Sequence, residues 1–241
     1  MCIVAIAHLA SDRYPLIVAA NRDERHDRPS AAADWWGGPG SLLAGRDLAA
    51  GGTWLGVTST GRFAAVTNVF EGGTVAPPKS RGALVTGFLR GKETPSEFAA
   101  ACEDEGSLYG PFNLVLRSGD ALYFVSNRNS STALGVGIHV FSNNAPGLQW
   151  SKVGALADAI DGVADRDDPA EFLIGRLSGP KARGPLERAA DSLFVVGETF
   201  GTRCTTVLTV DSDGRAAFVE QRFGPGGDAS GRSEFTFDIA A

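Results

Sequence analysis

The chain opens with MCIVAIAHLASDRYPLIVAANRDE, residues 1–24, and this stretch decides the fold. Two apolar runs, Ile3–Leu9 and Leu16–Ala20, are separated by a short polar segment, which predicts two strands joined by a turn. In an antiparallel pair, the polar end of the second run, Asn21-Arg22-Asp23-Glu24, returns to the side of Cys2. We therefore expect a thiol and a cluster of charged side chains at one end of a sheet.

Cys2 becomes the first residue once Met1 is removed, and processing enzymes accept a small side chain such as cysteine at that position. The mature residue then carries both an α-amine, with a pKa of about 7.7–8.0, and a thiol, with a pKa of about 8.5. The amine can accept the thiol proton directly or through water, so the nucleophile brings its own general base. The alternative is that Cys2 is a small apolar residue of an edge strand, because free cysteines are often buried.

The charged cluster after the second run supplies partners for such a nucleophile. Arg22 would lower the pKa of the thiol through its positive charge. Either Asp23 or Glu24 would anchor the α-ammonium group or orient the neutral amine, and the residues leave this choice open. The alternative for all three is a solvated charged turn at the end of a strand.

The remaining pattern predicts an α+β protein. With 241 residues, 43% hydrophobic content, no internal repeat and no shift in composition, we expect a single domain covering residues 1–241. Residues 27–52 read as a long irregular segment, and residues 178–191 as a loop. Helices are expected at Gly82–Arg90, Pro95–Glu105, Lys152–Asp161 and Pro169–Leu177. Further strands are expected at Trp54–Thr58, Arg62–Thr67, Asn113–Arg117, Leu122–Ser126, Ile138–Ser142, Leu193–Val196, Thr205–Val210, Ala216–Gln221 and Glu234–Phe237.

Composition argues against several classes of protein. A net charge of −6 and a pI near 5.1 argue against nucleic acid or an anionic membrane surface as the partner. No apolar run reaches about 18 residues, so no membrane span is expected. The first residues lack the basic segment of a signal peptide, which favours the cytoplasm. Three cysteines and three histidines without zinc-ligand spacing predict neither a disulfide framework nor a metal site.

Motifs along nearly the whole chain resemble those of the NRDE family, also called the transport and Golgi organisation family. The resemblance begins with Met1-Cys2-Ile3 and with the motif Asn21–Glu24 that names the family. It continues, in order, through Arg28–Ser30, Trp35-Trp36, Leu43–Asp47, Gly51–Val57, Gly61–Asn68, Arg81–Val85, Tyr109–Leu114, Ser142–Asn144 and Gly201–Thr206.

This family is in turn similar to the cysteine branch of the N-terminal-nucleophile (Ntn) hydrolases, which includes penicillin V acylase and bile-salt hydrolase. The resemblance implies an αββα sandwich of two stacked, mainly antiparallel sheets flanked by helices. Carried over one residue at a time, it implies catalytic roles for Cys2, Arg22, Asp23, Asn68, Asn143 and Arg203. The branch places its aspartate a few residues beyond the arginine, so the spacing here also admits Glu24.

Asn68 and Asn143 follow short apolar runs, and the resemblance implies that they stabilise an oxyanion or orient the substrate. One such amide donor contributes typically about 10²–10³ in rate. Arg203 matches a late arginine of the branch. The alternatives are that both asparagines close strands as turn residues and that Arg203 forms a weak surface ion pair.

The sequence therefore supports two functional hypotheses. The first is a cysteine hydrolase or acyltransferase, with Cys2 attacking a non-peptide C–N amide bond of a small molecule and no cofactor required. The second is a non-catalytic carrier on the same fold that binds haem, a lipid or acyl-coenzyme A, because the resemblance implies haem and lipid roles for eukaryotic members. A carrier would keep Cys2 as a soft ligand.

Overall fold

The structure, a computed structural model, describes residues 2–38, 41–69, 77–143, 151–179, 181–183 and 192–240. The chain divides into two compact units. Unit 1 comprises Met1–Arg28, Val136–Phe141 and Gln149–Asp238, and unit 2 comprises Pro29–Gly135, Ser142–Leu148 and Ile239–Ala241. Each unit draws on separate stretches of the chain, so neither corresponds to a continuous segment of sequence. The expectation of a single domain covering residues 1–241 stays a prediction.

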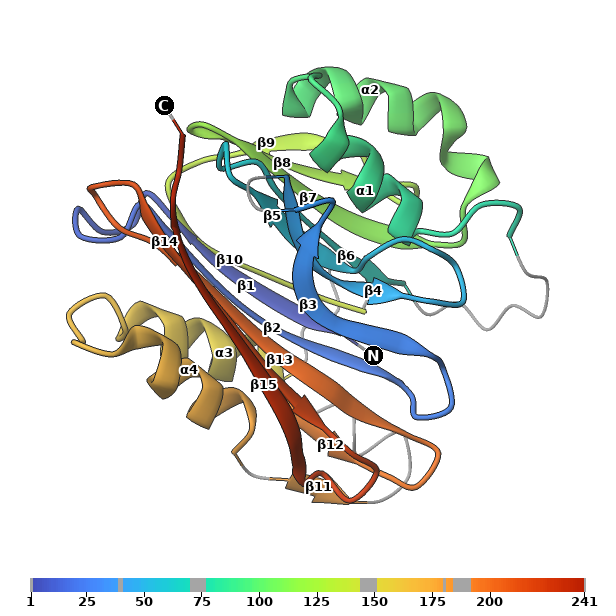
Figure 1. Cartoon of the computed structure of the whole chain (residues 1–241). Helices are drawn as coiled ribbons and strands as arrows, with labels where there is room; N and C mark the ends of the chain where they lie inside the picture. The colour runs from blue at the N-terminus through green and yellow to red at the C-terminus, as the bar shows by residue number, and fades with distance from the viewer. Residues whose placement is uncertain are drawn as a thin grey trace. The chain divides into compact units, whose positions relative to one another are not determined.

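Unit 1 is built on a six-stranded sheet with the order β10-β1-β2-β13-β14-β15. Its strands are β1 (Ile3–His8), β2 (Leu16–Arg25), β10 (Gly137–Ser142), β13 (Phe200–Val210), β14 (Arg215–Phe223) and β15 (Ala229–Asp238). A small parallel pair, β11 (Lys181–Arg183) and β12 (Phe194–Val196), belongs to the same unit. The helices α3 (Ser151–Asp161) and α4 (Pro169–Leu177) cover one face of the six-stranded sheet (Figure 1).

Alternation along β1 decides which side chains meet the helices of unit 1. Ile3, Ala5 and Ala7 are buried in one core cluster with Leu156 of α3 and Leu173 of α4. Successive residues of a strand point to opposite faces, so these three form the helix-covered face of β1. Two of the three are alanines, whose small side chains let the helices approach the strand closely.

Unit 2 is built on a seven-stranded sheet in which each strand pairs with its neighbour in sequence, in the order β3-β4-β5-β6-β7-β8-β9. The strands are β3 (Ser30–Trp36), β4 (Leu42–Asp47), β5 (Leu55–Thr58), β6 (Phe63–Asn68), β7 (Phe112–Ser118), β8 (Ala121–Ser126) and β9 (Thr132–Leu134). The helices are α1 (Gly82–Arg90), α2 (Pro95–Glu105) and a single 3₁₀ turn, η1 (Gly106–Leu108). Leu84, Val85 and Phe88 of α1 pack in one cluster with Phe112 and Leu114 of β7.

The helix α2 begins where its sequence predicts. The Thr94 side chain accepts a hydrogen bond from the backbone N–H of Glu97 at 3.3 Å, and the Thr94 N–H donates to the Glu97 carboxylate at 2.8 Å. This reciprocal capping box satisfies two backbone donors that the helix itself leaves unpaired. Pro95 occupies the first helical position, where its missing N–H costs nothing. In the described ranges, no helix combines the length and apolarity needed to cross a membrane.

The expectation of an irregular segment at residues 27–52 is wrong. The strands β3 and β4 lie there and pair antiparallel, with a bulge in β3 between Ala31 and Asp34. The sequence of β3, SAAADWW, contains no β-branched residue and alternates poorly, so its pairing depends on contact with β4 and not on local propensity. The short strands β9 and β11 were likewise not predicted. Of the expected loop at 178–191, residues 180 and 184–191 lie outside the described residues.

Gly52 is expected to be intolerant of substitution. A Cβ atom at Gly52 would lie 2.5 Å from the backbone carbonyl carbon of Gly82, at the start of α1. Since backbone cannot move aside as a flexible side chain can, Gly52→Ala should lower the free energy of unfolding by about 1–3 kcal/mol. Urea denaturation would measure this. Gly135→Ala is the matched control, because a Cβ atom there meets open space; equal stabilities of the two variants would contradict the expectation.

Candidate functional site

Cys2 lies next to Arg22 at one end of the sheet of unit 1. The register of β1 on β2 pairs Ile3 with Asn21, so one further step places Cys2 beside Arg22. On the other side of β2, Cys204 of β13 pairs with Arg22. Cys2 is partly exposed, whereas the Arg22 side chain is buried. The predicted return of the charged cluster to the side of Cys2 is thus confirmed.

The Cys2 thiol is held in its protonated form. Although the residue as a whole is partly exposed, desolvation of its thiol raises the pKa, and the negative charge of Asp23 raises it as well. The N-terminal ammonium, a hydrogen bond from the Asp23 backbone and the charge of Arg22 lower the pKa, but burial outweighs them. Arg22 therefore acts in the expected direction without producing a thiolate by itself. A thiol in this state needs a base before it can attack.

Asp23 is a buried carboxylate on the helix-covered face of β2. The Thr202 hydroxyl donates to it at 2.7 Å and itself accepts the backbone N–H of Val195 at 2.9 Å. Burial raises the pKa of Asp23, against the N-terminal ammonium, the Thr202 hydrogen bond, Lys152 and Arg22, which lower it. Asp23 thus interacts electrostatically with the Cys2 thiol and with the amino terminus of the chain that still carries Met1.

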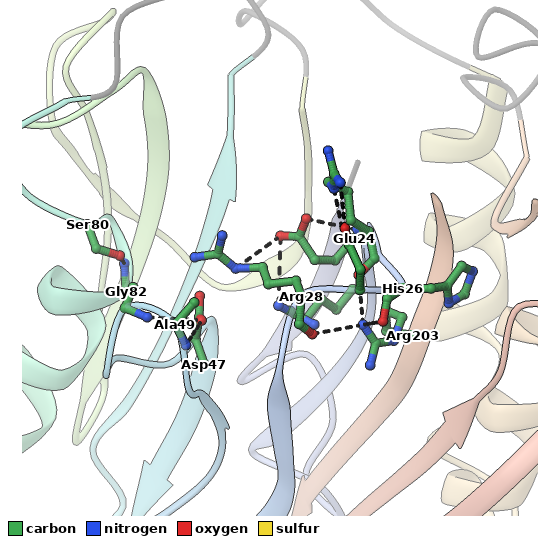
Figure 2. A network of polar contacts seen from close by, with 12 residues as sticks. Glu24, His26, Arg28, Asp47, Ala49, Ser80, Gly82 and Arg203 are labelled. Carbon is green, nitrogen blue, oxygen red and sulfur yellow. Dashed lines mark hydrogen bonds and ion pairs between the residues drawn. The ribbon is translucent and has the colours of Figure 1, made fainter. Parts of the chain in front are cut away.

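Glu24 has a different environment from Asp23. Its carboxylate lies 3.8 Å from a guanidinium nitrogen of Arg22 and 3.8 Å from one of Arg28 (Figure 2). Its side chain is about a quarter exposed (26%), whereas Asp23 is 6% exposed. Glu24 therefore links two arginines, whereas the charge of Asp23 raises the pKa of the Cys2 thiol. The assignment of one of them as the site acid stays a prediction.

Arg203 holds the turn that follows β2. It sits at a bulge where the register of β13 on β2 shifts between Thr202 and Cys204. One guanidinium nitrogen donates to three backbone carbonyls, those of Arg25 at 2.7 Å, His26 at 3.2 Å and Arg28 at 3.2 Å (Figure 2). These contacts identify Arg203 as a clamp on the backbone, a role that neither the resemblance nor the surface ion-pair alternative described.

Asn68 and Asn143 both belong to unit 2. Asn68 is the last residue of β6 and is partly exposed, whereas Asn143 follows β10 and is buried. The segments that carry them are joined, because the Thr67 hydroxyl and the Asn113 amide both donate to the Ser142 carbonyl, at 3.0 and 3.2 Å. The structure therefore brings these two asparagines into one region of unit 2. Asn144 lies outside the described residues.

Sequence reasoning missed three features of this region. Asn21 has a structural role: its side chain accepts a hydrogen bond from Thr205 at 2.6 Å and donates to the carbonyls of Leu177 and Leu193 at 3.0 and 2.7 Å. Thr202 was not singled out, although its hydroxyl contacts the candidate acid. The helical pattern around Lys152 gives no sign of a special role, but its side chain is buried and its charge acts on Asp23. Within the described part of the chain, no group of three or more His, Cys, Asp or Glu side chains could hold a metal ion.

The three cysteines are expected to react at different rates with iodoacetamide. Burial raises the pKa of Cys102 to about 12 and that of Cys204 well above its ordinary value, whereas Cys2 is partly exposed. Cys2 should therefore be labelled first, at a rate that increases with pH because alkylation requires the thiolate. Because Arg22 lowers the pKa of the thiol, Arg22→Met should move the rate profile of Cys2 to higher pH. Peptide mapping gives each rate; equal, slow labelling of all three would contradict this order.

Comparisons with known proteins agree with this architecture. The sequence profile for the family Transport and Golgi organisation 2 matches residues 1–225. The human Transport and Golgi organization protein 2 homolog is 30% identical over 255 residues, covering 92% of this chain and 92% of its own length. Penicillin V acylase from Agrobacterium tumefaciens aligns in structure over 99% of this chain and 86% of its own, with a TM-score of 0.58 and 13% identity. The Caenorhabditis elegans ortholog of N-acylethanolamine-hydrolyzing acid amidase aligns over 86% of this chain and 92% of its own, with a TM-score of 0.52 and 11% identity.

At such low identities, the structural matches establish the fold alone. They confirm the α+β fold class of the Ntn hydrolases. Among the described residues, this chain has two large sheets, four α-helices and the small parallel pair β11–β12. The sequence matches establish the family as well, because they cover most of the chain and agree with the motifs from Cys2 to Thr206. The chain belongs to the Transport and Golgi organisation 2 family.

Proposed function

We propose that this protein is a cysteine amidohydrolase in which Cys2, after removal of Met1, attacks a non-peptide C–N amide bond of a small molecule. The observation that carries the proposal is the position of Cys2, which the register of β1 on β2 places beside Arg22 and next to the buried Asp23, whose charge acts on the thiol. A thiol whose pKa is raised needs a neighbouring base, and the α-amine of the same residue can provide it.

In the proposed reaction, the α-amine of Cys2 takes the thiol proton as the sulfur bonds to the carbonyl carbon. The family resemblance implies that side-chain N–H groups of Asn68 and Asn143 donate to the resulting oxyanion. The intermediate collapses by breaking the C–N bond, and the α-ammonium returns its proton to the leaving amine. Water then hydrolyses the thioester and releases the carboxylic acid and the free thiol.

Two names among the structural relatives guide the choice of substrates. One relative is a penicillin V acylase and another is an ortholog of an amidase that hydrolyses N-acylethanolamines. Both names describe the removal of an acyl group from nitrogen. We therefore propose small N-acyl amides as the substrate class and a panel of such amides, including penicillin V and an N-acylethanolamine, as the first screen.

A trapped acyl-enzyme tests the proposal directly. Intact mass should first show that Met1 is absent from the purified chain. Incubation with a β-lactone should then add one acyl group, and peptide mapping should place it on Cys2 and leave Cys102 and Cys204 unmodified. A retained Met1, or an acyl group distributed over all three cysteines, would contradict the proposal.

The carrier hypothesis makes a different prediction. A haem carrier should show a shifted Soret band at micromolar haem, and the shift should disappear in Cys2→Ala if the thiol is the ligand. Haem binding that depends on Cys2, in a chain that no β-lactone or amide acylates, would favour the carrier over the hydrolase.

A further inference from the structure

The side chain of Lys152 is buried, which is unusual for a lysine. The side chain is 2% exposed and lies in the first turn of α3. Lysines are almost never fully buried unless they are paired, and the N-terminal end of a helix disfavours a cation because the helix dipole is positive there. Packing alone therefore gives no reason for a lysine at this position, and an opposite charge close to it would stabilise the buried ammonium.

The geometry of unit 1 indicates Asp23 as that opposite charge. Lys152 is one turn before Leu156, so both side chains point from α3 to the sheet, and both are buried. Leu156 packs in one cluster with Ala19 of β2. Alternation along β2 puts Asp23 on the same face as Ala19 and Asn21, and that is the face the helices cover. The two charged groups thus occupy the same layer, between α3 and the sheet.

Electrostatics supports this pairing. Burial favours the neutral form of Asp23 by raising its pKa, and three positive charges oppose that effect: the terminal ammonium of the chain that still carries Met1, Lys152 and Arg22. Of the other groups packed on Asp23, Thr202 of β13 is neutral and donates a hydrogen bond, and Cys2 carries the thiol. Lys152 is the one of these positive charges that comes from a helix.

We propose that Lys152 is a positioning residue of the Cys2 site: its ammonium keeps Asp23 as a carboxylate, which accepts an N–H of the Cys2 α-amine and directs the amine's lone pair to the thiol. This inference rests on the proposed function, since it assigns the α-amine as the base. Lys152 itself touches neither the substrate nor the reacting atoms in this scheme. Its effect passes through Asp23.

The test compares Lys152→Met, which removes the charge and keeps most of the stem, with Lys152→Arg, which keeps the charge. Lys92→Met, at an exposed position, is the matched control for the loss of one lysine. The readouts are the titration of the Asp23 carboxyl carbon by ¹³C NMR, assigned with Asp23→Asn, and the pH profile of Cys2 acylation by a β-lactone. Folding of each variant is checked by its thermal melt.

In Lys152→Met, Asp23 should stay protonated to higher pH, because an opposing positive charge is gone. The rise of the acylation rate on the acidic side of the pH profile should also move to higher pH. At a pH well below the pKa of Asp23, the rate should fall about tenfold for each unit by which that pKa increases. Lys152→Arg should restore both, and Lys92→Met should change neither. A folded Lys152→Met with an unchanged Asp23 titration, or a changed titration with an unmoved acylation profile, would overturn the proposal.

A buried carboxylate left without its partner can also prevent folding. If Lys152→Met does not fold, the double variant with Asp23→Asn should fold again, because both buried charges are then removed; a double variant as unstable as Lys152→Met would refute the pairing. The Asp23 titration needs no turnover. If the protein hydrolyses no amide, the proposed function is refuted. The titration of Asp23 in the Lys152 variants would still show whether Lys152 sets the protonation of Asp23.

Discussion

Replacing Cys2 by alanine is expected to reduce amide hydrolysis by about 10³-fold or more, because the variant has no atom that can form the thioester. Alanine is small enough for Met1 still to be removed, so the α-amine remains in place and only the nucleophile is lost. Cys2 is partly exposed and precedes β1, so the melting temperature should change little. Hydrolysis of the best amide of the panel, with intact mass after β-lactone treatment, measures the effect.

Cys102→Ala is the matched control for this variant. Cys102 is buried in the cluster where α1 and α2 pack on the sheet of unit 2. Its truncation should lower the free energy of unfolding by about 1 kcal/mol and leave hydrolysis unchanged. Full activity in Cys2→Ala, or equal loss of activity in the two variants, would refute Cys2 as the nucleophile.

A peptide fused in front of Cys2 is expected to lower hydrolysis by about 10²–10⁴-fold, the usual contribution of a general base. The fusion turns the α-amine into an amide, which does not accept a proton near neutral pH. The thiol stays in place, but burial keeps its pKa raised, so little thiolate forms without the base. Turnover before and after removal of the peptide would measure the contribution of the amine in a single protein.

The fusion should end in a protease site joined directly to Cys2, so that cleavage exposes Cys2 as the first residue. A second sample, cleaved to leave one extra residue before Cys2, controls for the presence of the protease and for the length of the tag. Activity should return only where Cys2 itself is exposed. Equal activity of the fused and the cleaved protein would show that the α-amine is not the base.

The sequence predicted a strand or helix correctly where the pattern within that segment is enough to define it. The apolar runs before and after the first turn predict β1 and the buried part of β2, and Thr94 with Pro95 predicts the start of α2. The β3 and β4 strands had no such signal, because the alanine-rich β3 is stabilised by its partner strand. Pairing between two strands cannot be read from the local pattern of either strand.

For the candidate site, the sequence identified the side chains that lie together but not their protonation states. Cys2, Arg22 and Asp23 lie together as expected, yet burial, which depends on the whole of unit 1, decides that the thiol is protonated. Lys152 is 129 residues away from Asp23 in sequence (152 minus 23), and only the packing of α3 on β1 brings its charge to the carboxylate. The clamp formed by Arg203 depends on a bulge in β13 that has no sequence signature of its own.

The alternation within Asn21–Glu24 limits how this chain can change in evolution. Asn21 anchors the backbone and Asp23 faces the helices, whereas Arg22 and Glu24 point to the opposite face and form an ion pair at 3.8 Å. A single residue gained or lost within Leu16–Asp23 would exchange the two sets between the faces of the sheet. Insertions in the turn before Leu16 leave the register of the strands untouched. We therefore expect length variation among related chains to accumulate in that turn and to be absent between Leu16 and Asp23.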